Sequence, residues 1–254
     1  MIYETRNDFR PVAMIPVYNH HTVLEAITDT LIARGLSVIL VDDGSSRPCA
    51  DVLDHLGQKP GVTLIRNPVN GGKGAACMLG FMAARFAGYT HVLQVDADGQ
   101  HDLSAVPEML AVGRKQPDAF VCGAPRYDAS VPKARLWGRR LTNFWVHVNT
   151  NSRVLVDAMC GFRLYPLAAC LRVMRACRLT RRMDFDPEIA VRLIWQGVPV
   201  INQNVAVTYP QDGVSHFQTL RDNVRISCLH TKLFFLMLAR RTGLLKRPAA
   251  DSEA

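Results

Sequence analysis

The stretch His91-Val92-Leu93-Gln94-Val95-Asp96-Ala97-Asp98-Gly99-Gln100 decides the fold of this chain. Its apolar first half is typical of a buried strand, and its second half places two carboxylates and an amide where that strand leaves the core. Two carboxylates at this spacing can converge on one hard divalent cation, and the amide oxygen can join them. We therefore predict that Asp96, Asp98 and Gln100 bind Mg²⁺ or Mn²⁺ together with a substrate diphosphate.

Two other interpretations of this stretch compete with a metal site. An Asp-rich turn after a strand often bonds only its own backbone, and that is the more frequent case for an isolated Asp-x-Asp. A calcium-binding EF-hand loop does not fit, because Gln100 stands in place of a third acid and Pro107 in place of the closing Glu.

The composition bounds the class of protein. The chain has 254 residues, 48% hydrophobic and 20% charged, which is typical of one globular domain or a domain with an appendage. Its seven cysteines include no Cys-x-x-Cys pair, so we expect reduced thiols in a cytosolic protein. Residues 1–10 lack the apolar run of a secretion signal, and no stretch is apolar enough to span a bilayer. The formal net charge of +8 favours a polyanionic partner, which would be nucleic acid, anionic membrane or phosphorylated substrate.

Strands and helices alternate along the first half of the chain. We predict strands over residues 11–16, 36–41, 62–66, 91–95 and 119–122, and helices over residues 22–33, 73–87 and 104–115. Thr22 with Glu25 indicates a capping box for the first helix, and Ser104 indicates an N-cap for the third. This alternation predicts an α/β fold with a doubly wound, mostly parallel sheet.

In such sheets ligands bind beyond the carboxyl ends of the strands. Tyr18 follows the first predicted strand and can stack on a base, while Asp42 or Asp43 follows the second and can accept hydrogen bonds from base or ribose. Lys73 begins a helix, where negative charge is favoured. Alone, Tyr18 would be a packing residue and Lys73 a surface lysine, but together with Asp96 they predict recognition of a nucleoside diphosphate.

The glycine pattern excludes two common nucleotide sites. A dinucleotide-binding unit requires Gly-x-Gly-x-x-Gly after the first strand, where this chain has Val17-Tyr18-Asn19-His20. A Walker loop does not fit either, because Asn67 replaces its leading Gly and Gly74 replaces the Ser or Thr that would hold Mg²⁺.

Four motifs occur in a fixed order, namely PVYN (residues 16–19), VDDGS (41–45), NPVNGGKG (67–74) and DADGQH (96–101). In order and spacing they resemble the signature of glycosyltransferase family 2, and in particular its polyprenyl-phosphate (dolichol-phosphate mannose synthase-like) branch. Further matches are PRY (125–127), CGFRL (160–164) and GVS (213–215). The similarity covers residues 11–216.

The resemblance implies a GT-A fold and an inverting hexosyltransferase that uses a nucleotide-activated sugar. The metal ligands would be Asp96, Asp98 and Gln100, and the cofactor Mg²⁺ or Mn²⁺. The resemblance further implies a set of residues that bind the nucleotide sugar: Pro16, Tyr18, Asn19, Asp42, Asp43, Lys73, Gly74, Asp96, Ala97, Asp98, Arg126 and His216.

Three positions depart from the family pattern. His20 replaces an acid, Pro210 replaces an Arg, and His216 replaces a Lys. Fewer cationic side chains are therefore expected to contact the leaving diphosphate, unless His216, Arg126 or Arg163 supplies these contacts.

The segment from Met183 to Glu188 carries the candidate general base. Asp184 and Glu188 are the candidate catalytic residues, while Asp186 is expected to be the N-cap of a helix that Pro187 begins. The alternative is that these acids only complement the helix dipole. A hydroxyl acceptor would need a base, whereas a lipid phosphate is already ionised near neutral pH.

Two stretches, residues 133–148 and 226–245, interleave basic and apolar side chains, as helices that lie in a membrane surface do. Ordinary core-covering or dimerising helices are the alternative. We divide the chain into a catalytic domain over residues 1–216, a C-terminal basic amphipathic segment over 217–247 and a disordered tail over 248–254. Within the catalytic domain, residues 10–123 form the nucleotide-binding half and residues 124–216 the acceptor half.

The sequence thus predicts a metal-dependent glycosyltransferase that moves a sugar from a nucleotide-diphosphate sugar to a lipid-type acceptor. It would work at the cytoplasmic face of the cell membrane as a peripheral protein. A nucleotidyltransferase is disfavoured, because residues 17–21 are not a Gly-rich basic loop. A catalytically degenerate transferase-like subunit and a basic nucleic-acid-binding protein are the remaining hypotheses. We expect no nucleic-acid partner, since such a partner gives no reason for Asp96 and Asp98.

Overall fold

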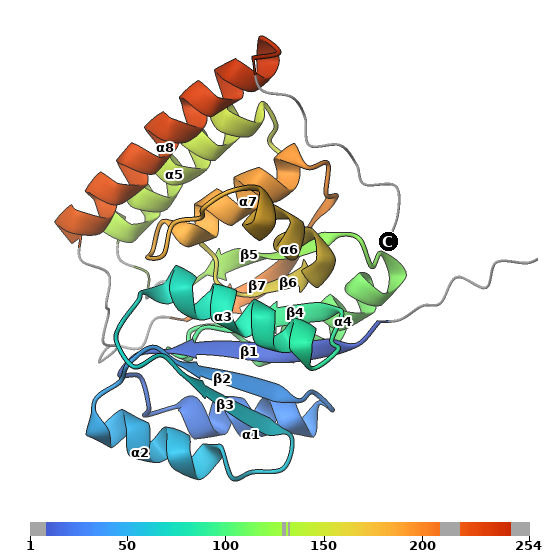
Figure 1. Cartoon of the computed structure of the whole chain (residues 1–254), viewed down its shortest axis with the longest axis vertical. Coiled ribbons are helices and arrows are strands. Elements are labelled where there is room, and N and C mark those ends of the chain that lie inside the picture. Colours follow the sequence, from blue (N-terminus) through green and yellow to red (C-terminus); the bar gives the residue numbers. More distant parts are fainter. Residues whose placement is uncertain (1–8, 129–130, 132, 209–218, 245–254) are drawn as a thin grey trace, which may run out of the picture.

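The computed structural model describes residues 9–128, 131, 133–208 and 219–244. Seven strands form one sheet in the order β3-β2-β1-β4-β6-β5-β7, with helices on both of its faces (Figure 1). The strands are β1 (Pro11–Val17), β2 (Val38–Asp42), β3 (Val62–Arg66), β4 (His91–Gln94), β5 (Phe120–Tyr127), β6 (Arg163–Pro166) and β7 (Val200–Val207).

Most of the sheet is parallel. Strand β1 pairs in parallel with β2 and β4, β2 with β3, and β5 with β7, whereas β6 runs antiparallel to its neighbours β4 and β5. The predicted doubly wound, mostly parallel α/β sheet is therefore confirmed. Because β1 and β4 are neighbours with the same direction, the segments that follow Val17 and Gln94 leave the sheet at the same edge.

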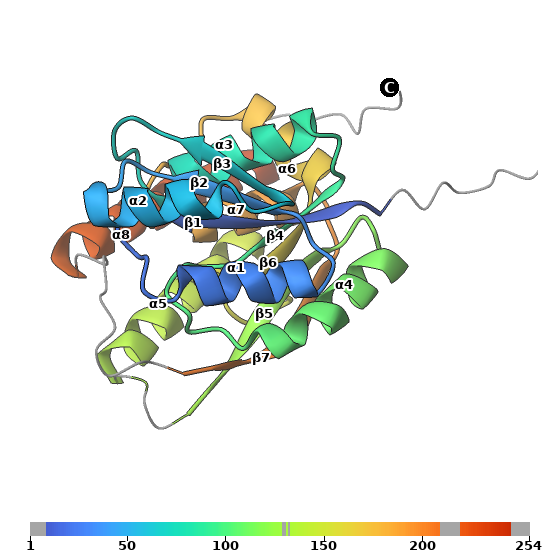
Figure 2. The same ribbon diagram turned by 90° about the horizontal axis from the view of Figure 1, so that it is seen from below.

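Two layers of helices cover the sheet. Helices α1 (Leu24–Ala33), α2 (Arg47–Leu56) and α4 (Val106–Lys115) pack on one face, with the short 3₁₀ helix η1 (Leu103–Ala105) before α4. Helices α3 (Lys73–Phe86), α6 (Leu167–Ala176) and α7 (Phe185–Trp195) pack on the other face (Figures 1 and 2). Side chains alternate along β1, so Val12 and Met14 join the core under α3 while Ala13 and Ile15 join the core under α1.

The two remaining helices, α5 (Lys133–Thr150) and α8 (Thr219–Arg241), lie side by side at one end of the molecule (Figure 1). Trp145 of α5 contacts the rings of His230 and Phe234 of α8, with ring centroids 6.4 and 6.5 Å apart. The predicted C-terminal helix is confirmed. No helix in the described part of the chain has both the length and the apolarity that a bilayer crossing requires.

Several local predictions were wrong. Val23, not Thr22, precedes α1, and no side chain caps that helix. Asp102, not Ser104, is the capping residue near α4, because its carboxylate accepts the Ser104 N–H. Helix α7 begins at Phe185, so Asp186 lies inside it rather than at its N-cap. The sequence interpretation also missed α2, β6, α6 and β7. The predicted disordered tail over residues 248–254 lies outside the described residues.

Candidate functional site

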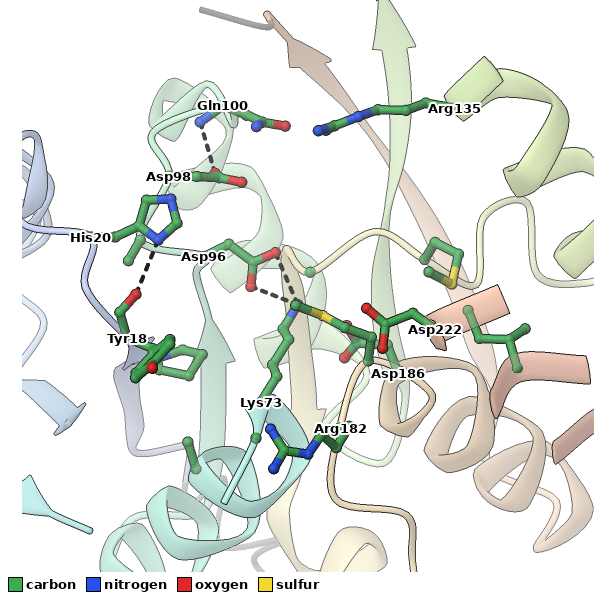
Figure 3. A pocket seen from close by; sticks show the side chains of 18 of the residues that line it. Tyr18, His20, Lys73, Asp96, Asp98, Gln100, Arg135, Arg182, Asp186 and Asp222 are labelled. Carbon is green, nitrogen blue, oxygen red and sulfur yellow. Dashed lines mark hydrogen bonds and ion pairs between the residues drawn. The ribbon is translucent and has the colours of Figure 1, made fainter. Parts of the chain in front are cut away.

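A cavity of about 620 Å³ opens where β1 and β4 end. Its volume is typical of sites for small organic ligands. The segments after β1 and β4, the start of α3, the loop before α7 and the facing parts of α5 and α8 all contribute to its wall (Figure 3). Its charged and imidazole side chains are Asp43, Asp96, Asp98, Asp186, Asp222, Lys73, Arg135, Arg139, Arg182, Arg221, Arg225, His20 and His101.

Lys73, the first residue of α3, joins two acids in this wall. Its Nζ lies 2.8 Å from Asp96 Oδ1, 3.0 Å from Asp96 Oδ2 and 2.7 Å from Asp186 Oδ2 (Figure 3). Burial opposes the charge of the ammonium group, but the two acids outweigh it and raise the pKa of Lys73 well above its usual value. Burial likewise works to raise the pKa of Asp96, and Lys73 reverses that effect, so the pKa of Asp96 is lowered. Both partners are therefore ionised at neutral pH.

The Asp96 carboxylate lies against the backbone of Gly161. A Cβ built on Gly161 would overlap the carboxylate carbon and both of its oxygens, so residue 161 leaves room for this acid only as glycine. The side-chain amide of Gln94 lies 3.5 Å from Asp96 Oδ1 on the strand side. Residues from β4, α3 and the segment before β6 thus fix the orientation of Asp96.

Asp98, Gln100 and His101 also line the cavity. Asp98 Oδ1 accepts the Gln100 backbone N–H at 3.1 Å, which closes the turn. The His101 ring stacks on Phe162, and its burial lowers the pKa of the imidazole even though Asp96 and Asp98 work against that shift. Among the described residues, no group of three or more His, Cys, Asp or Glu side chains is arranged to hold a metal ion.

Pro16, Tyr18 and Ala97 also form part of the wall, as the sequence led us to expect for donor-binding residues. Tyr18 is half-buried at the end of β1, and its carbonyl oxygen lies 3.3 Å from His20 Nδ1 (Figure 3). Tyr18 therefore contributes an aromatic side chain to the cavity that Lys73 and Asp96 also line.

Asp43 reaches the cavity while holding the glycine-rich loop. Its carboxylate accepts the backbone N–H groups of Gly71 at 2.9 Å and Gly72 at 2.7 Å, and the Asn67 amide at 3.0 Å. These bonds place Gly72, whose φ of 96° favours glycine, directly before Lys73. Asp43 thus positions Lys73 through the loop.

Three other expected donor-binding residues have structural roles and are not among the lining residues. Asp42 accepts the Ser45 N–H and an Arg66 N–H. Asn19 accepts from the backbone N–H and the hydroxyl of Ser46. Gly74 allows α3 to pack against Phe185, because a Cβ there would lie 2.6 Å from the Phe185 Cβ.

The candidate catalytic acids Asp184 and Glu188 do not line the cavity either. Glu188 is completely buried, and its two oxygens accept hydrogen bonds from the Thr180 N–H at 2.7 Å and from the Arg192 guanidinium at 2.7 and 2.9 Å. Asp184 is also buried, which raises the pKa of its carboxyl group. The acid that this segment contributes to the cavity is Asp186.

The proposed substitute cations are also placed differently from expectation. Arg126 is exposed on β5 and is not among the lining residues. Arg163 is completely buried and donates to the backbone oxygens of Ala158 at 2.7 Å and Asp186 at 2.8 Å, so it supports the site from behind. His216 and Pro210 lie outside the described residues.

The sequence interpretation missed the arginines that line the cavity from α5, α8 and the loop before α7. Arg139 pairs with Asp157 at 2.9 Å, Arg225 with Asp222 at 3.5 Å, and Arg182 donates to the Asn70 side chain at 2.6 Å. The signal available in the sequence was the crowding of Arg and Lys in the second half, which does not tell which of them share a cavity.

The family model described as glycosyl transferase family 2 matches residues 12–172 of this chain. The chain is 31% identical over 186 residues to an undecaprenyl-phosphate 4-deoxy-4-formamido-L-arabinose transferase of Pseudomonas aeruginosa, covering 70% of this chain and 52% of that protein. It is 30% identical over 163 residues to a dolichyl-phosphate beta-glucosyltransferase of Trichomonas vaginalis, covering 61% of this chain and 49% of that protein. The chain therefore spans about half the length of these two relatives.

Solved structures show the same fold. Glucosyl-3-phosphoglycerate synthase from Mycobacterium tuberculosis, crystallised with Mn²⁺, uridine-diphosphate-glucose and phosphoglyceric acid, aligns with a TM-score of 0.65 at 11% identity. The alignment covers 90% of this chain and 79% of that one. The likeness confirms the expected GT-A fold, and at this identity it shows the fold alone.

Proposed function

This chain belongs to glycosyl transferase family 2, and on that premise we propose that it moves a sugar from a nucleotide-diphosphate sugar to a lipid phosphate. The observation that carries the proposal is the meeting of Asp96, Asp98 and Gln100 with Tyr18 and Lys73 around one cavity. Oxygen ligands can hold a cation, an aromatic ring can stack on a base and a basic group can bind phosphate, so together they can recognise a nucleoside diphosphate.

The donor would lie along the β1 and β4 side of the cavity. Tyr18 would stack on the base, Asp43 would accept hydrogen bonds from base or ribose, and Lys73 would meet the diphosphate at the start of α3. The Gly72 N–H at this helix start already binds Asp43, so it is not available to the diphosphate, and the Lys73 ammonium would supply positive charge there.

The residues present fit a divalent cation. Asp96, Asp98 and Gln100 offer carboxylate and amide oxygens, which Mg²⁺ and Mn²⁺ prefer, and all three line the cavity. Bound there, the cation would stabilise the charge that develops on the leaving diphosphate. Since the described residues contain no cluster of three suitable acids, imidazoles or thiolates, the donor's own phosphate oxygens would complete the ligand set.

The acceptor would lie on the α5 and α8 side. Arg135, Arg139 and Arg225 line that part of the cavity, and arginine is well suited to bind a phosphate group. The two relatives named above are, by their names, transferases that act with undecaprenyl phosphate and dolichyl phosphate. A phosphate acceptor is ionised near neutral pH and needs no protein base, which agrees with the burial of Glu188 away from the cavity.

A lipid acceptor requires contact with a membrane surface. On α5, Trp137, Leu141 and Phe144 are 70%, 60% and 57% exposed, and on α8 Phe235 is 64% exposed. Arg135 and Arg139, on the same helix as Trp137, line the cavity. We therefore place α5 at the cytoplasmic face of the cell membrane, with its apolar side chains in the headgroup layer.

Calorimetric titration with UDP and with GDP, with and without Mn²⁺, tests the proposal. We expect Mn²⁺-dependent binding of at least one diphosphate, and a loss of at least tenfold in affinity in Asp98→Asn. Asp102→Asn is the matched control, because Asp102 belongs to the same segment but does not line the cavity. Absence of binding to both nucleotides in the unsubstituted protein would contradict the proposal and favour a catalytically degenerate subunit.

A further inference from the structure

Lys73 forms an ion pair with both carboxylate oxygens of Asp96 in this structure. Both Asp96 oxygens lie within 3.0 Å of the Lys73 ammonium nitrogen, and the Asp96 side chain is only about one-fifth exposed. A carboxylate that already has a cation on both oxygens is a poor ligand for a second one, because two cations beside one carboxylate repel each other. The ion pair with Lys73 therefore occupies both oxygens of Asp96.

Asp186 provides Lys73 with a second anchor. Its Oδ2 lies 2.7 Å from Lys73 Nζ, and the residue is only 3% exposed. Its other oxygen, Oδ1, has no hydrogen-bond partner among the described residues, and the guanidinium of Arg163 lies 3.7 Å away. Asp186 therefore gives Lys73 a carboxylate contact that does not involve Asp96.

We propose that Lys73 is an internal counter-ion that occupies Asp96 and must turn toward the donor's diphosphate before a divalent cation can bind Asp96. The inference rests on the proposed function and deepens it. Lys73 is a flexible point charge on a four-carbon stem, so it can pivot on Asp186 and exchange one carboxylate for phosphate oxygens. The cation and the diphosphate then bind together, and the cation alone binds weakly.

The test measures Mn²⁺ binding in the absence of nucleotide, with the electron paramagnetic resonance signal of free Mn²⁺ as the readout. We expect Lys73→Gln to bind Mn²⁺ alone at least tenfold more tightly than the unsubstituted protein, because Asp96 is released. Lys59→Gln is the matched control, since Lys59 also pairs with two acids, Glu25 at 2.9 Å and Asp29 at 2.7 Å, and does not line the cavity. It should bind Mn²⁺ like the unsubstituted protein.

A second measurement needs no variant. In the unsubstituted protein, saturating UDP or GDP should tighten Mn²⁺ binding at least tenfold. Equal Mn²⁺ affinity in Lys73→Gln and the unsubstituted protein overturns the inference, as does a diphosphate that binds without changing Mn²⁺ affinity. If neither diphosphate binds with or without Mn²⁺, the proposed function itself is overturned, which separates the two failures.

Discussion

At the residue scale, the orientation of Asp96 depends on the missing side chain of residue 161. Gly161 precedes β6, far from Asp96 in sequence, yet a Cβ there would overlap the carboxylate. The same carboxylate is held by Lys73 from α3. Any side chain at position 161 must therefore push Asp96 away from Lys73 or move the backbone before β6, and both changes alter the candidate metal site.

Gly161→Ala should lower the affinity for a nucleoside diphosphate in the presence of Mn²⁺ by at least tenfold, because the added methyl group displaces Asp96. The measurement is calorimetric titration with the diphosphate that the unsubstituted protein binds. Gly138→Ala is the control, since Gly138 lines the same cavity from α5 but a Cβ there meets nothing within 4 Å. Equal losses in both variants, or none in Gly161→Ala, would show that the overlap does not matter.

Some residues of the candidate site could be predicted from the sequence, and others could not. Asp96, Asp98, Tyr18 and Lys73 could be predicted, because each follows a strand or begins a helix and parallel strands bring such positions to one edge. Asp186 was expected only as the N-cap of a helix that Pro187 begins, but α7 begins two residues earlier, at Phe185, and Asp186 lines the cavity. The cavity arginines depend on how α5 and α8 pack, which no local pattern encodes.

At the element scale, α8 is held on the rest of the molecule through a polar contact with α5. His230 of α8 is 2% exposed, and the Asn149 side-chain amide of α5 donates to its Nδ1 at 3.2 Å. The backbone carbonyl of Asn149 in turn accepts the Trp195 indole N–H of α7 at 2.9 Å, and Arg240 of α8 donates to the backbone carbonyl of Trp195. Burial lowers the pKa of His230 to about 4, so the ring is neutral in the folded protein.

Stability should therefore fall as the pH falls below about 6.5, the ordinary pKa of histidine. Between pH 6.5 and pH 4 His230 binds a proton in the unfolded chain but not in the folded protein. The stabilisation from the buried neutral ring is therefore fully present above pH 6.5 and is lost as the pH falls through this range. At pH 5 the loss is about 2 kcal/mol. Urea unfolding at pH 7 and pH 5 should show a smaller loss in His230→Gln than in the unsubstituted protein. Identical losses would contradict the burial of a neutral His230.

The elements themselves could be predicted unevenly. The strands β1 to β4 and helix α3 have strong apolar patterns, and their bounds agree closely with expectation. Strand β6 has only four residues and runs antiparallel inside a mostly parallel sheet. Neither its length nor the alternation of strands and helices therefore indicated a strand at this position. The start of α1 at Leu24 was not predicted, because no side chain caps this helix and the packing of Leu24 and Ile27 in the core holds its first turn.

At the scale of the whole molecule, exposed apolar side chains combine with a formal net charge of +8. The exposed positions Trp137, Leu141 and Phe144 are three and four residues apart, so they lie on one side of α5. Arg140 lies over the Trp137 ring, 5.7 Å from its centroid. An apolar stripe with an adjacent cation suits a surface of anionic lipid.

Replacing Trp137, Leu141 and Phe144 together by Ser should reduce sedimentation with anionic lipid vesicles at least fivefold, because the buried apolar area is lost. The matched control replaces Val69, Met82 and Phe86 by Ser, which are exposed to a similar degree away from α5. Sedimentation of the unsubstituted protein no greater than with neutral vesicles would refute the membrane contact. Equal losses in the two triple variants would refute the role of α5.

Sugar transfer is the most direct test of the central claim. The purified protein would be incubated with Mn²⁺, a panel of UDP- and GDP-sugars and a polyprenyl phosphate in detergent, and the lipid product identified by mass spectrometry. We predict a glycosylated polyprenyl phosphate from at least one donor, and at least a hundredfold less of it with Asp98→Asn. A protein that binds a donor yet glycosylates no lipid phosphate, or an Asp98→Asn variant of equal activity, would contradict the account.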